Sequence, residues 1–358
     1  MLRFVLVRCL NGFLVLVGII IIVFLLFNVM PDPGRMMLGQ RADGASIQAI
    51  NKDLGRDLPI TKRFILYIND LSPISWHNFT QTESHIYADH SKYGHYTQIF
   101  ITDNGNGLVL KFPYLRRSYQ SMRRVSEILW DAFPGTLVLA FSAMFIGTLL
   151  GIILGIFSAV KKGTYIDKFI LFIASAGVSM PSFFAGLIIA WLFAVVLHRW
   201  TGLNWTGSLY HYDPFEGRVL DLKNLILPSL ALGIRPLAVI VQLTRNSMLE
   251  VLQQDYIRTA KAKGLHPFTI LRKHALKNAM NPVVTTISGW FASLLAGAFF
   301  VETIFNWHGI GKVTVDALTT YDFPVVMGAV LFVAVIFVVL NILVDLIYAK
   351  LDPRVALR

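Results

Sequence analysis

The most regular feature of the sequence is a series of long apolar runs separated by polar segments. Each run is long enough to cross a bilayer core of about 30 Å as a helix. We place six such spans at residues 9–30, 133–160, 169–197, 225–243, 282–301 and 325–348. The first follows Arg3 and Arg8, but it is too long for the apolar part of a signal peptide, and no small-residue cleavage site follows it. We therefore predict that it is retained as a span.

The segment between the first two spans, residues 31–132, is too long to be a mere connection. Ser46 and Gly55 are candidate start and stop signals of a short helix. Residues 59–70 have the pattern of a second, amphipathic helix, and residues 95–112 alternate around an Asn/Gly turn as a β-hairpin does. The segment is predicted to be a small α+β domain outside the membrane.

The orientation of the spans follows from charge in the short loops. Residues 161–168 contain three lysines, and residues 244–281 contain seven Lys or Arg, whereas the loop after the fifth span has only Lys312. Basic short loops stay in the cytoplasm, while a long segment such as residues 31–132 is translocated largely regardless of its charge. The predicted fold is an all-α polytopic membrane protein with six transmembrane helices, both termini cytoplasmic, and a small extracytoplasmic α+β loop domain after the first helix.

This topology divides the chain into successive parts. They are an N-terminal segment with the first transmembrane helix (residues 1–30), the extracytoplasmic loop domain (31–132), a transmembrane core of five helices (133–348) that contains a cytoplasmic loop (244–281), and a cytoplasmic tail (349–358).

Composition agrees with a membrane protein. Hydrophobic residues make up 55% of the chain, charged residues only 15%, and the mean hydropathy is +0.60. The net charge of +11 is placed as topology requires, so we expect no nucleic-acid partner. The single cysteine, Cys9, excludes an internal disulfide and leaves the redox compartment open.

Small residues and prolines indicate how the spans pack. Glycines recur every four residues on one face of the second span, which favours close approach of another helix: Gly147, Gly151 and Gly155. Pro181 interrupts the third span, and Pro228 and Pro236 lie in the fourth. Such prolines are tolerated where neighbouring groups satisfy the freed carbonyls, and they suit a bundle that moves.

Residue patterns typical of catalysis are missing. The Gly311-Lys312 pair lacks the upstream glycine and the following Ser/Thr of a nucleotide-binding loop, and neither zinc-type spacing nor a nucleophile turn occurs. Four histidines of the outer segment are interpreted as solvated surface groups: His77, His85, His90 and His95. Glu302 and Asp345 lie at opposite ends of their spans, so an acid pair is not expected. We predict no catalytic residue, no cofactor and no metal site.

Arg235 is the unusual charge within the membrane. It lies about 15 Å into the fourth span at a rise of 1.5 Å per residue. One interpretation is that it snorkels or pairs with backbone carbonyls near Pro236. The other is that it faces a water-filled translocation path and meets negative charge on a substrate.

The cytoplasmic loop has a two-part helical pattern. Apolar positions recur at helical spacing from Leu249 through Leu252 and Tyr256 to Ala260, and Gly264 breaks the pattern. A second helical stretch begins near Pro267. The pattern predicts two helices joined at a glycine elbow. A basic helix lying on anionic lipid remains the alternative.

Several blocks of this sequence resemble the permease subunits of ABC importers. Their cytoplasmic loop carries a motif of Glu-Ala-Ala, three further residues and a glycine. The matching positions here are Arg258-Thr259-Ala260 and Gly264, although only Ala260 and Gly264 keep the general signature. "DYIRTAKAKG" and "HALKNAMNPVVT" are similar to the dipeptide, oligopeptide and nickel permeases. So are "VMPDPGRMMLGQRA", "SEILWDAFPGTLVLA", "GAFFVETIFNWHGIGKVTVDALTTYDFPVVMGAV" and "LVDLIYAKLDPR". Two departures are an insertion at residues 77–111 and His308 where the family usually has proline.

The resemblance implies the partners and the mechanism. Two separate cytoplasmic ATPase subunits would bind ATP, a second homologous permease would complete the path, and an extracytoplasmic binding protein would deliver the substrate. The helix ending at Gly264 would dock into a groove of one ATPase, with Tyr256 and Ala260 buried and Arg258 and Lys261 at the polar rim. The ATPase-coupling residues are then Leu252, Tyr256, Arg258, Thr259, Ala260, Lys261 and Gly264.

The substrate stays open at this point. Such permeases handle dipeptides, longer peptides, nickel chelates and some sugars, and the resemblance favours peptides. An ion-coupled transporter or channel is the alternative class, and it should show acids near the bilayer midplane. The sequence has no such acid, and an elbow loop has no purpose without a cytoplasmic partner.

Overall fold

The structure is a computed structural model, and it describes residues 2–29, 58–82, 84–213, 215 and 217–351. The chain forms two compact units. The first consists of Met1–Gly12, Ala132–Lys312 and Ile336–Arg358, and the second of Phe13–Asp131 and Val313–Val335. The predicted helix between Ser46 and Gly55 lies outside the described residues.

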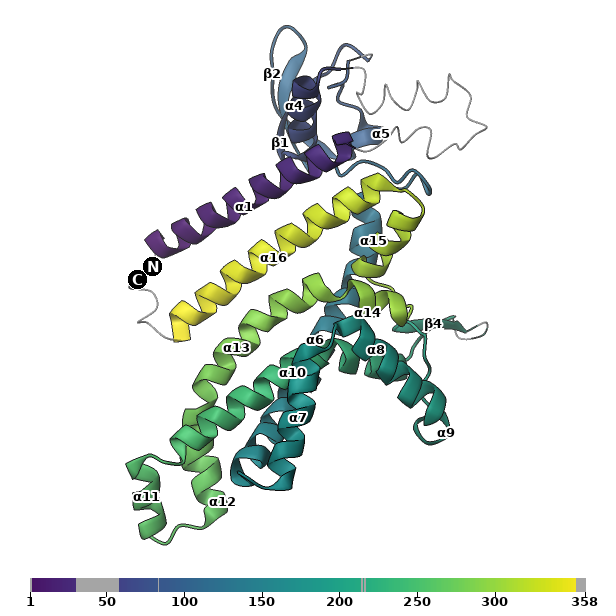
Figure 1. Cartoon of the computed structure of the whole chain (residues 1–358). Helices are drawn as coiled ribbons and strands as arrows, with labels where there is room; N and C mark the ends of the chain where they lie inside the picture. The colour runs from purple at the N-terminus through teal and green to yellow at the C-terminus, as the bar shows by residue number, and fades with distance from the viewer. Residues whose placement is uncertain (1, 30–57, 83, 214, 216, 352–358) are drawn as a thin grey trace. The chain divides into compact units, whose positions relative to one another are not determined.

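Long helices dominate the first unit (Figure 1). In chain order they and the shorter elements between them are α6 (Val125–Val160), α7 (Tyr165–Ser179), α8 (Ser182–Ala190), the π-helix η2 (Trp191–Val196), α9 (His198–Thr201), α10 (Lys223–Val251), α11 (Asp255–Ala262), α12 (Pro267–Thr269), the π-helix η3 (Ile270–Ala275), α13 (Leu276–Gly297) and α14 (Phe299–Ile304). A short hairpin, which the sequence analysis missed, precedes α10: β4 (Tyr210–Asp213) and β5 (Gly217–Leu220).

Two further helices, α1 (Leu2–Val29) and α16 (Phe323–Leu351), have parts in both units, as does α6, whose residues 125–131 belong to the second. The helix α15 (Ile310–Thr319) begins at the end of the first unit. In the first unit Arg8 of α1 pairs with Asp345 of α16 at 3.1 Å. A Cβ on Gly12 would lie 2.6 Å from the Val338 side chain, so the two helices approach closely there.

Among the described residues, four helices are long and apolar enough to cross a membrane, or five crossings if one bent pair counts as a span. The four are α1, α6, α10 and α16, and the bent pair is Tyr165–Ser179 with Ser182–Val196. The helix α13 overlaps the predicted fifth span but is not among them, because its Asn, Thr and Ser residues lower its mean hydropathy.

The third predicted span differs from a kinked helix. Its two halves are bent by 119° at the break before Pro181, where Met180 is extended with φ −74° and ψ 135°. A residue before proline is disfavoured in the α region, and proline has no N–H for the ladder, so both effects end α7. Such a pair is either a broken span or a re-entrant loop.

The glycine face of α6 lies against α10. A Cβ on Gly147 would sit 3.0 Å from the carbonyl oxygen of Gly233, and one on Gly151 would sit 2.8 Å from the Ile240 side chain. One on Gly155 would lie 2.6 Å from the Cβ of Thr244. The absence of side chains at these three positions therefore sets the separation of the two helices.

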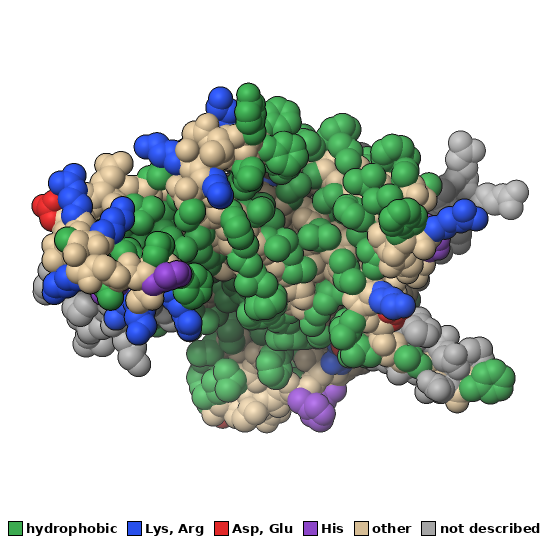
Figure 2. Space-filling model, turned by 90° about the horizontal axis from the view of Figure 1, so that it is seen from below, with side chains coloured by type: hydrophobic (Ala, Val, Ile, Leu, Met, Phe, Trp, Pro, Cys, Tyr) green, Lys and Arg blue, Asp and Glu red, His purple; other side chains and the backbone are tan. Residues whose placement is uncertain are grey.

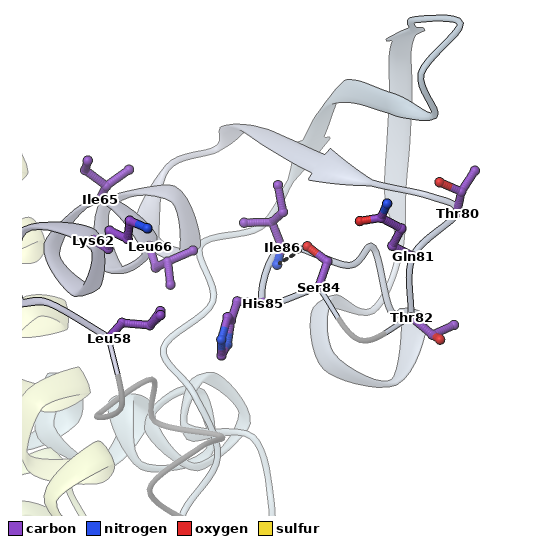
Figure 3. A pocket seen from close by; sticks show the side chains of 10 residues that line it. All are labelled: Leu58, Lys62, Ile65, Leu66, Thr80, Gln81, Thr82, Ser84, His85 and Ile86. Atoms are coloured by element: carbon purple, nitrogen blue, oxygen red, sulfur yellow. Dashed lines mark hydrogen bonds between the residues drawn. The ribbon is translucent and has the colours of Figure 1, made fainter.

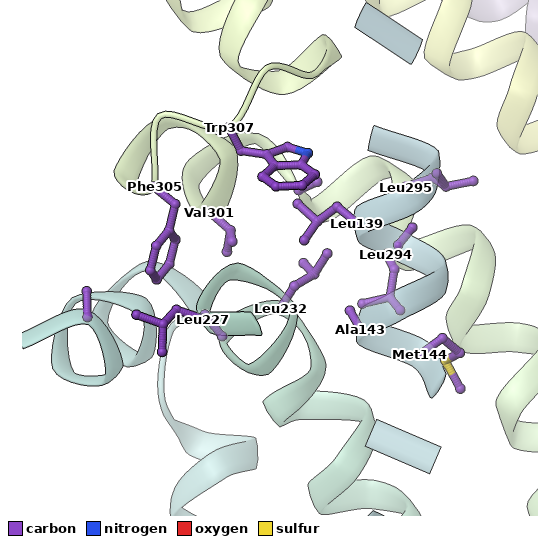
Figure 4. Close-up of a cluster of buried hydrophobic side chains, with 14 of the residues drawn as sticks. Leu139, Ala143, Met144, Leu227, Leu232, Leu294, Leu295, Val301, Phe305 and Trp307 are labelled. Carbon is purple, nitrogen blue, oxygen red and sulfur yellow. The ribbon is translucent and has the colours of Figure 1, made fainter. Parts of the chain in front are cut away.

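The main apolar core of the first unit lies where α6, α10, α13 and α14 meet (Figure 4). Its largest buried side chains, Trp307 and Phe305, follow α14 and point into the cluster with Leu139 of α6 and Leu227 of α10. The indole Nε1 of Trp307 also donates to the carbonyl of Gly135 at 2.9 Å. The turn after α14 is thereby fixed to α6.

The second unit contains the predicted outer domain. The amphipathic helix is confirmed as α4 (Ile60–Leu71), and the hairpin as β2 (Tyr96–Ile101) with β3 (Asn106–Lys111). The hairpin does not stand alone, because β1 (Ile74–Asn78) pairs with β3 to give the sheet order β1-β3-β2, and a short helix, α5 (His90–Tyr93), precedes β2. Strand β1 was not predicted, and its alternation is inverted: the polar Ser75 and His77 are buried, whereas Ile74 and Trp76 are exposed.

A cavity of about 870 Å³ lies between α4 and the segment that follows β1 (Figure 3). One wall is apolar, with Ile65 and Leu66, and the opposite wall is polar, with Thr80, Gln81 and Ser84. His77 is not at the surface as predicted: it is fully buried, with Nδ1 3.0 Å from the Ile86 carbonyl and Nε2 2.9 Å from the Ser75 hydroxyl.

Candidate functional site

The loop at residues 244–281 folds as two helices around a glycine, as predicted. The helix α11 ends at Ala262, and Gly264 follows with φ +73°, a backbone region that glycine enters without steric cost. The next helical stretch begins at Pro267, and the imidazole of His266 accepts a hydrogen bond from the backbone N–H of Phe268. A side chain at the N-cap and proline at the first helical position are both strong start signals.

The inner face of α11 is buried against the chain itself. Ile257 is fully buried and Ala260 is 6% exposed, and both belong to an apolar cluster with Met248 of α10. The cluster is completed by residues of the second helical stretch and by one residue of α6: Ile270, Ala275, Ala279 and Ala159. This face holds the elbow against the membrane helices.

The outer face of α11 is polar and exposed. Tyr256 is 41% exposed, and its hydroxyl accepts a hydrogen bond of 2.8 Å from Asn278. Arg258 pairs only loosely with Asp255, at 3.3 Å on an exposed surface. Figure 2 shows the surface from below the view of Figure 1. Basic side chains gather at one edge of this surface, next to a largely hydrophobic area. The exposed basic residues of the loop are Arg258, Lys261, Lys263, Arg272, Lys273 and Lys277.

The structure therefore divides the predicted coupling residues into two groups. Leu252 and Ala260 pack inside the loop, which differs from the expectation that Ala260 lies at a partner's surface. Tyr256, Arg258, Thr259 and Lys261 remain exposed, and Gly264 forms the elbow. The helical spacing placed Ala260 on an apolar face correctly, but spacing alone does not tell which neighbour covers that face.

Arg235 is exposed on α10, one residue before Pro236, which is buried. The structure brings no acid to it among the hydrogen bonds and ion pairs of the described residues. The helix continues through both prolines without a break. Arg235 thus projects from the bundle rather than into its core.

Two acidic residues outside the predicted set are almost completely buried. Asp167, at the start of α7, is 2% exposed and forms a bidentate ion pair with Arg245 near the end of α10. Glu302 of α14 is 0% exposed and accepts hydrogen bonds from the Thr136 hydroxyl and the Lys312 backbone. The pattern Thr-x-x-Asp at 164–167 was an available signal for the first, since it marks a helix N-terminus.

The Glu302 site explains the glycines of "WHGIGK". A Cβ on Gly309 would lie 2.5 Å from the carboxyl carbon of Glu302, and one on Gly311 would lie 2.9 Å from a carboxylate oxygen. The carboxylate also lies at the N-terminus of α15, where backbone N–H groups have no partner within the helix and negative charge is favoured.

Comparison with known proteins identifies the family. Residues 151–357 match the model for the inner membrane component of binding-protein-dependent transport systems, and residues 1–84 match the model for the N-terminal region of such components. The chain belongs to this family. It is therefore a multi-pass bacterial inner membrane protein and a permease of the ABC-importer class rather than an enzyme.

Similar proteins extend over nearly the whole chain. The chain is 34% identical to the dipeptide transport system permease protein DppB of Alkalihalophilus pseudofirmus over 95% of each chain. It is 34% identical to the di/tripeptide transport system permease protein DppB of Pseudomonas aeruginosa over 94% of each chain. A solved chain of the MetNI methionine ABC transporter, in an inward-facing conformation, is 19% identical with a TM-score of 0.47, covering 63% of this chain and 97% of that one.

Proposed function

We propose that this permease forms half of the translocation path for di- or oligopeptides that an extracytoplasmic binding protein delivers. The observation that carries the proposal is similarity over nearly the full length to permeases named for dipeptide and di/tripeptide transport. The aligned region covers 95% and 94% of this chain, respectively. Import of a nickel chelate or another small solute by the same machinery is the second candidate.

Energy for transport comes from two partner ATPases, because the chain lacks a nucleotide-binding loop of its own. We propose that one ATPase receives α11. The exposed face of α11, with Tyr256, Arg258 and Lys261, forms the contact, while Leu252 and Ala260 hold α11 to the elbow from inside. Closure of the ATPases then displaces the elbow and switches the spans between two states.

Six crossings with both ends in the cytoplasm fit the charge distribution. This count takes α7 and α8 with η2 as the third crossing and α13 as the fifth. A helix as polar as α13 suits a position beside a water-filled path rather than among lipid chains. A second, homologous permease supplies the other half of the path, and lipid surrounds the assembly.

Arg235 is proposed to face the path and to attract the negative charge of a substrate. Its exposure on α10 supports this role, because a lipid-facing arginine near the midplane is costly. Arg235→Gln at equal expression should reduce uptake of substrates with a free carboxylate. Unchanged uptake would leave Arg235 as a snorkelling residue.

The outer segment at residues 77–111 is proposed to be a docking or shielding element around the outer mouth. It contains the β2–β3 hairpin, whose strand β2 is largely exposed on both faces. Deletion of residues 77–111 should weaken binding-protein affinity. A deletion variant with normal affinity and uptake would remove this role.

Uptake by whole cells tests the substrate. A strain lacking this chain and a complemented strain are supplied with radiolabelled dipeptides, tripeptides or nickel(II). We expect uptake of the peptides only in the complemented strain and only with its ATPases intact. Peptide uptake that depends on an ion gradient and persists without ATPases would instead support an ion-coupled transporter, and restored nickel uptake alone would support the second candidate.

A further inference from the structure

A buried ionic cluster joins three membrane helices directly above the elbow. The carboxylate of Asp167 accepts hydrogen bonds from Arg245 through both oxygens, with Nε at 2.8 Å and the second guanidinium nitrogen at 2.9 Å. Ser158, at the end of α6, donates its hydroxyl hydrogen bond to the same carboxylate, and the backbone N–H of Gly163 donates another at 2.9 Å. We call Ser158, Asp167 and Arg245 the ionic clamp.

The clamp is largely buried and geometrically specific. The side chains of Asp167 and Arg245 are 3% and 16% exposed, and Ser158 is fully buried. Bidentate pairing between a guanidinium and a carboxylate fixes orientation as well as distance, and a lysine cannot reproduce it. The exposed pair of Arg123 with Asp131, 2.6 Å apart, has no further side-chain hydrogen bond among the described residues.

The position of the clamp links it to the elbow. Arg245 lies on the last turns of α10, which continues as one helix to Val251, immediately before α11. Next to Ser158 on α6, Ala159 packs in the same apolar cluster as Ile257 and Ala260 of α11. The elbow is therefore attached to the end of α6 twice, by apolar contact and by the clamp.

The helix packing beside the clamp is equally close. Gly155 of α6 leaves room for Thr244, the residue before Arg245. A Cβ added at Gly155 would lie 2.6 Å from the Cβ of Thr244. The Thr164 hydroxyl accepts a hydrogen bond from the backbone N–H of Asp167 and caps the start of α7, while the Asp167 carboxylate accepts from Gly163 just before that helix. The ends of α6 and α10, the start of α7 and the elbow thus form one continuous block.

We propose that the ionic clamp is the positioning element that makes this block move as a rigid body, so that displacement of α11 reaches α7 and α6. The inference rests on the proposed coupling role of α11. Asp167 and Arg245 lie between the ends of α7 and α10, so they act through the helices that they join. Without the clamp, α10 can shift at its end while α7 stays in place, and the two sides of the membrane lose their coupling.

The test uses the complete transporter in proteoliposomes: this chain, its partner permease, the ATPases and the binding protein. The two readouts are ATP hydrolysed per labelled di- or tripeptide imported, and stimulation of ATP hydrolysis by the loaded binding protein. Asp167→Asn and Arg245→Gln should retain the ATPases and basal hydrolysis. Both should lose stimulation and uptake per ATP on the order of tenfold, a usual size for coupling between distant sites.

Two further variants separate coupling from simple stability. Arg245→Lys keeps the charge but not the bidentate pairing with the carboxylate, and it should give an intermediate loss of coupling. The double variant Asp167→Asn with Arg245→Gln should be no worse than either single variant, because both remove the same interaction. Asp131→Asn, which breaks the exposed pair with Arg123, is the control and should couple as the wild type does.

Each outcome decides between the proposals. Wild-type coupling in Asp167→Asn would contradict the proposed role of the clamp. Failure of both Asp167→Asn and Arg245→Lys to assemble would contradict it too, because the pair would then be needed only for folding. A wild-type chain that does not retain the ATPases, or that imports no peptide, would instead contradict the proposed function and leave no coupling to explain.

Discussion

The Thr136 hydroxyl donates a hydrogen bond of 2.7 Å to the Glu302 carboxylate, although the two residues lie 166 positions apart. Thr136 also accepts a bond of 2.8 Å from the backbone N–H of Ile310, so one hydroxyl connects α6, α14 and the start of α15. A fully buried carboxylate is tolerated only when hydrogen bonds satisfy its oxygens. This relationship fixes the turn that carries Trp307 and the two glycines after it.

Substitution of Glu302 should reveal this dependence. Glu302→Gln replaces one accepting oxygen with an NH₂ group, which donates. This group faces either the Thr136 hydroxyl or the Lys312 N–H, so that one of these buried donors is left without an acceptor. We expect destabilisation of about 1–3 kcal/mol, measured as a lower midpoint of thermal unfolding in nanodiscs. Thr136→Ser keeps the hydroxyl and should stay near the wild type, whereas an unshifted midpoint in Glu302→Gln would contradict the account.

Gly264 should tolerate asparagine but not valine. A Cβ at this position meets nothing within 4 Å, so the only obstacle is its φ of +73°. A left-handed conformation costs an L-residue about 1–2 kcal/mol, least for asparagine and more for a β-branched residue. Gly264→Val should therefore distort the elbow and lower uptake per ATP, while Gly264→Asn retains it. Equal coupling in both variants would mean that the elbow geometry is not needed.

The outer unit should loosen in acid. Burial lowers the pKa of His77 from 6.5 to about 4, and Lys111 acts in the same direction. Of the other charged groups near His77, Lys92 also lowers its pKa and Asp70 raises it. The Tyr93 ring packs on the imidazole. Because the folded pKa lies below the unfolded one, stability is complete above pH 6.5 and is lost as pH falls towards 4.

Hydrogen exchange in β1 and β3 measures this effect. The difference between the two pKa values corresponds to about 3 kcal/mol of opening free energy between pH 7 and pH 4. Protection factors, which correct for the intrinsic slowing of amide exchange in acid, should fall in this interval in the wild type and depend less on pH in His77→Gln. The same acid response in both proteins would assign the loosening to other groups.

The bend between α7 and α8 makes the topology testable. After Cys9→Ser, which removes the single cysteine, Lys162→Cys and Trp200→Cys place exposed thiols before and after the bent pair. Six crossings predict that a membrane-impermeant maleimide labels the first only from the cytoplasmic side and the second only from outside. Labelling of both from one side would make the pair a re-entrant loop.

The sequence was most informative where a local pattern sufficed. The break at Gly264, the start at Pro267, the helix α4 and the β2–β3 hairpin all follow from short-range signals, and the structure has them. The strand β1 and the burial of His77 depend on a partner strand far along the chain, which no local pattern describes. The inward direction of Ala260 likewise depends on α6 and α13.

Long-range polar contacts were the main omission. In the sequence Glu302 marks the end of a span, and Asp167 carries no signal of burial, because a single acid near a membrane boundary is ordinary in isolation. Their burial arises from Thr136 and Arg245, which lie 166 and 78 positions away. Spacing in a sequence carries no record of such pairs. The Pro181 signal was noticed, but the angle of the bend depends on packing.

The most direct test of the proposed coupling concerns the exposed face of α11. Tyr256→Asp is compared with Tyr210→Asp, because both tyrosines are 41% exposed while Tyr210 lies on β4 rather than in the loop. The measurement is peptide imported per ATP hydrolysed in the reconstituted transporter. The account predicts a large loss in Tyr256→Asp, with normal insertion, and none in Tyr210→Asp. A Tyr256→Asp transporter that retains its ATPases and the wild-type ratio would contradict it.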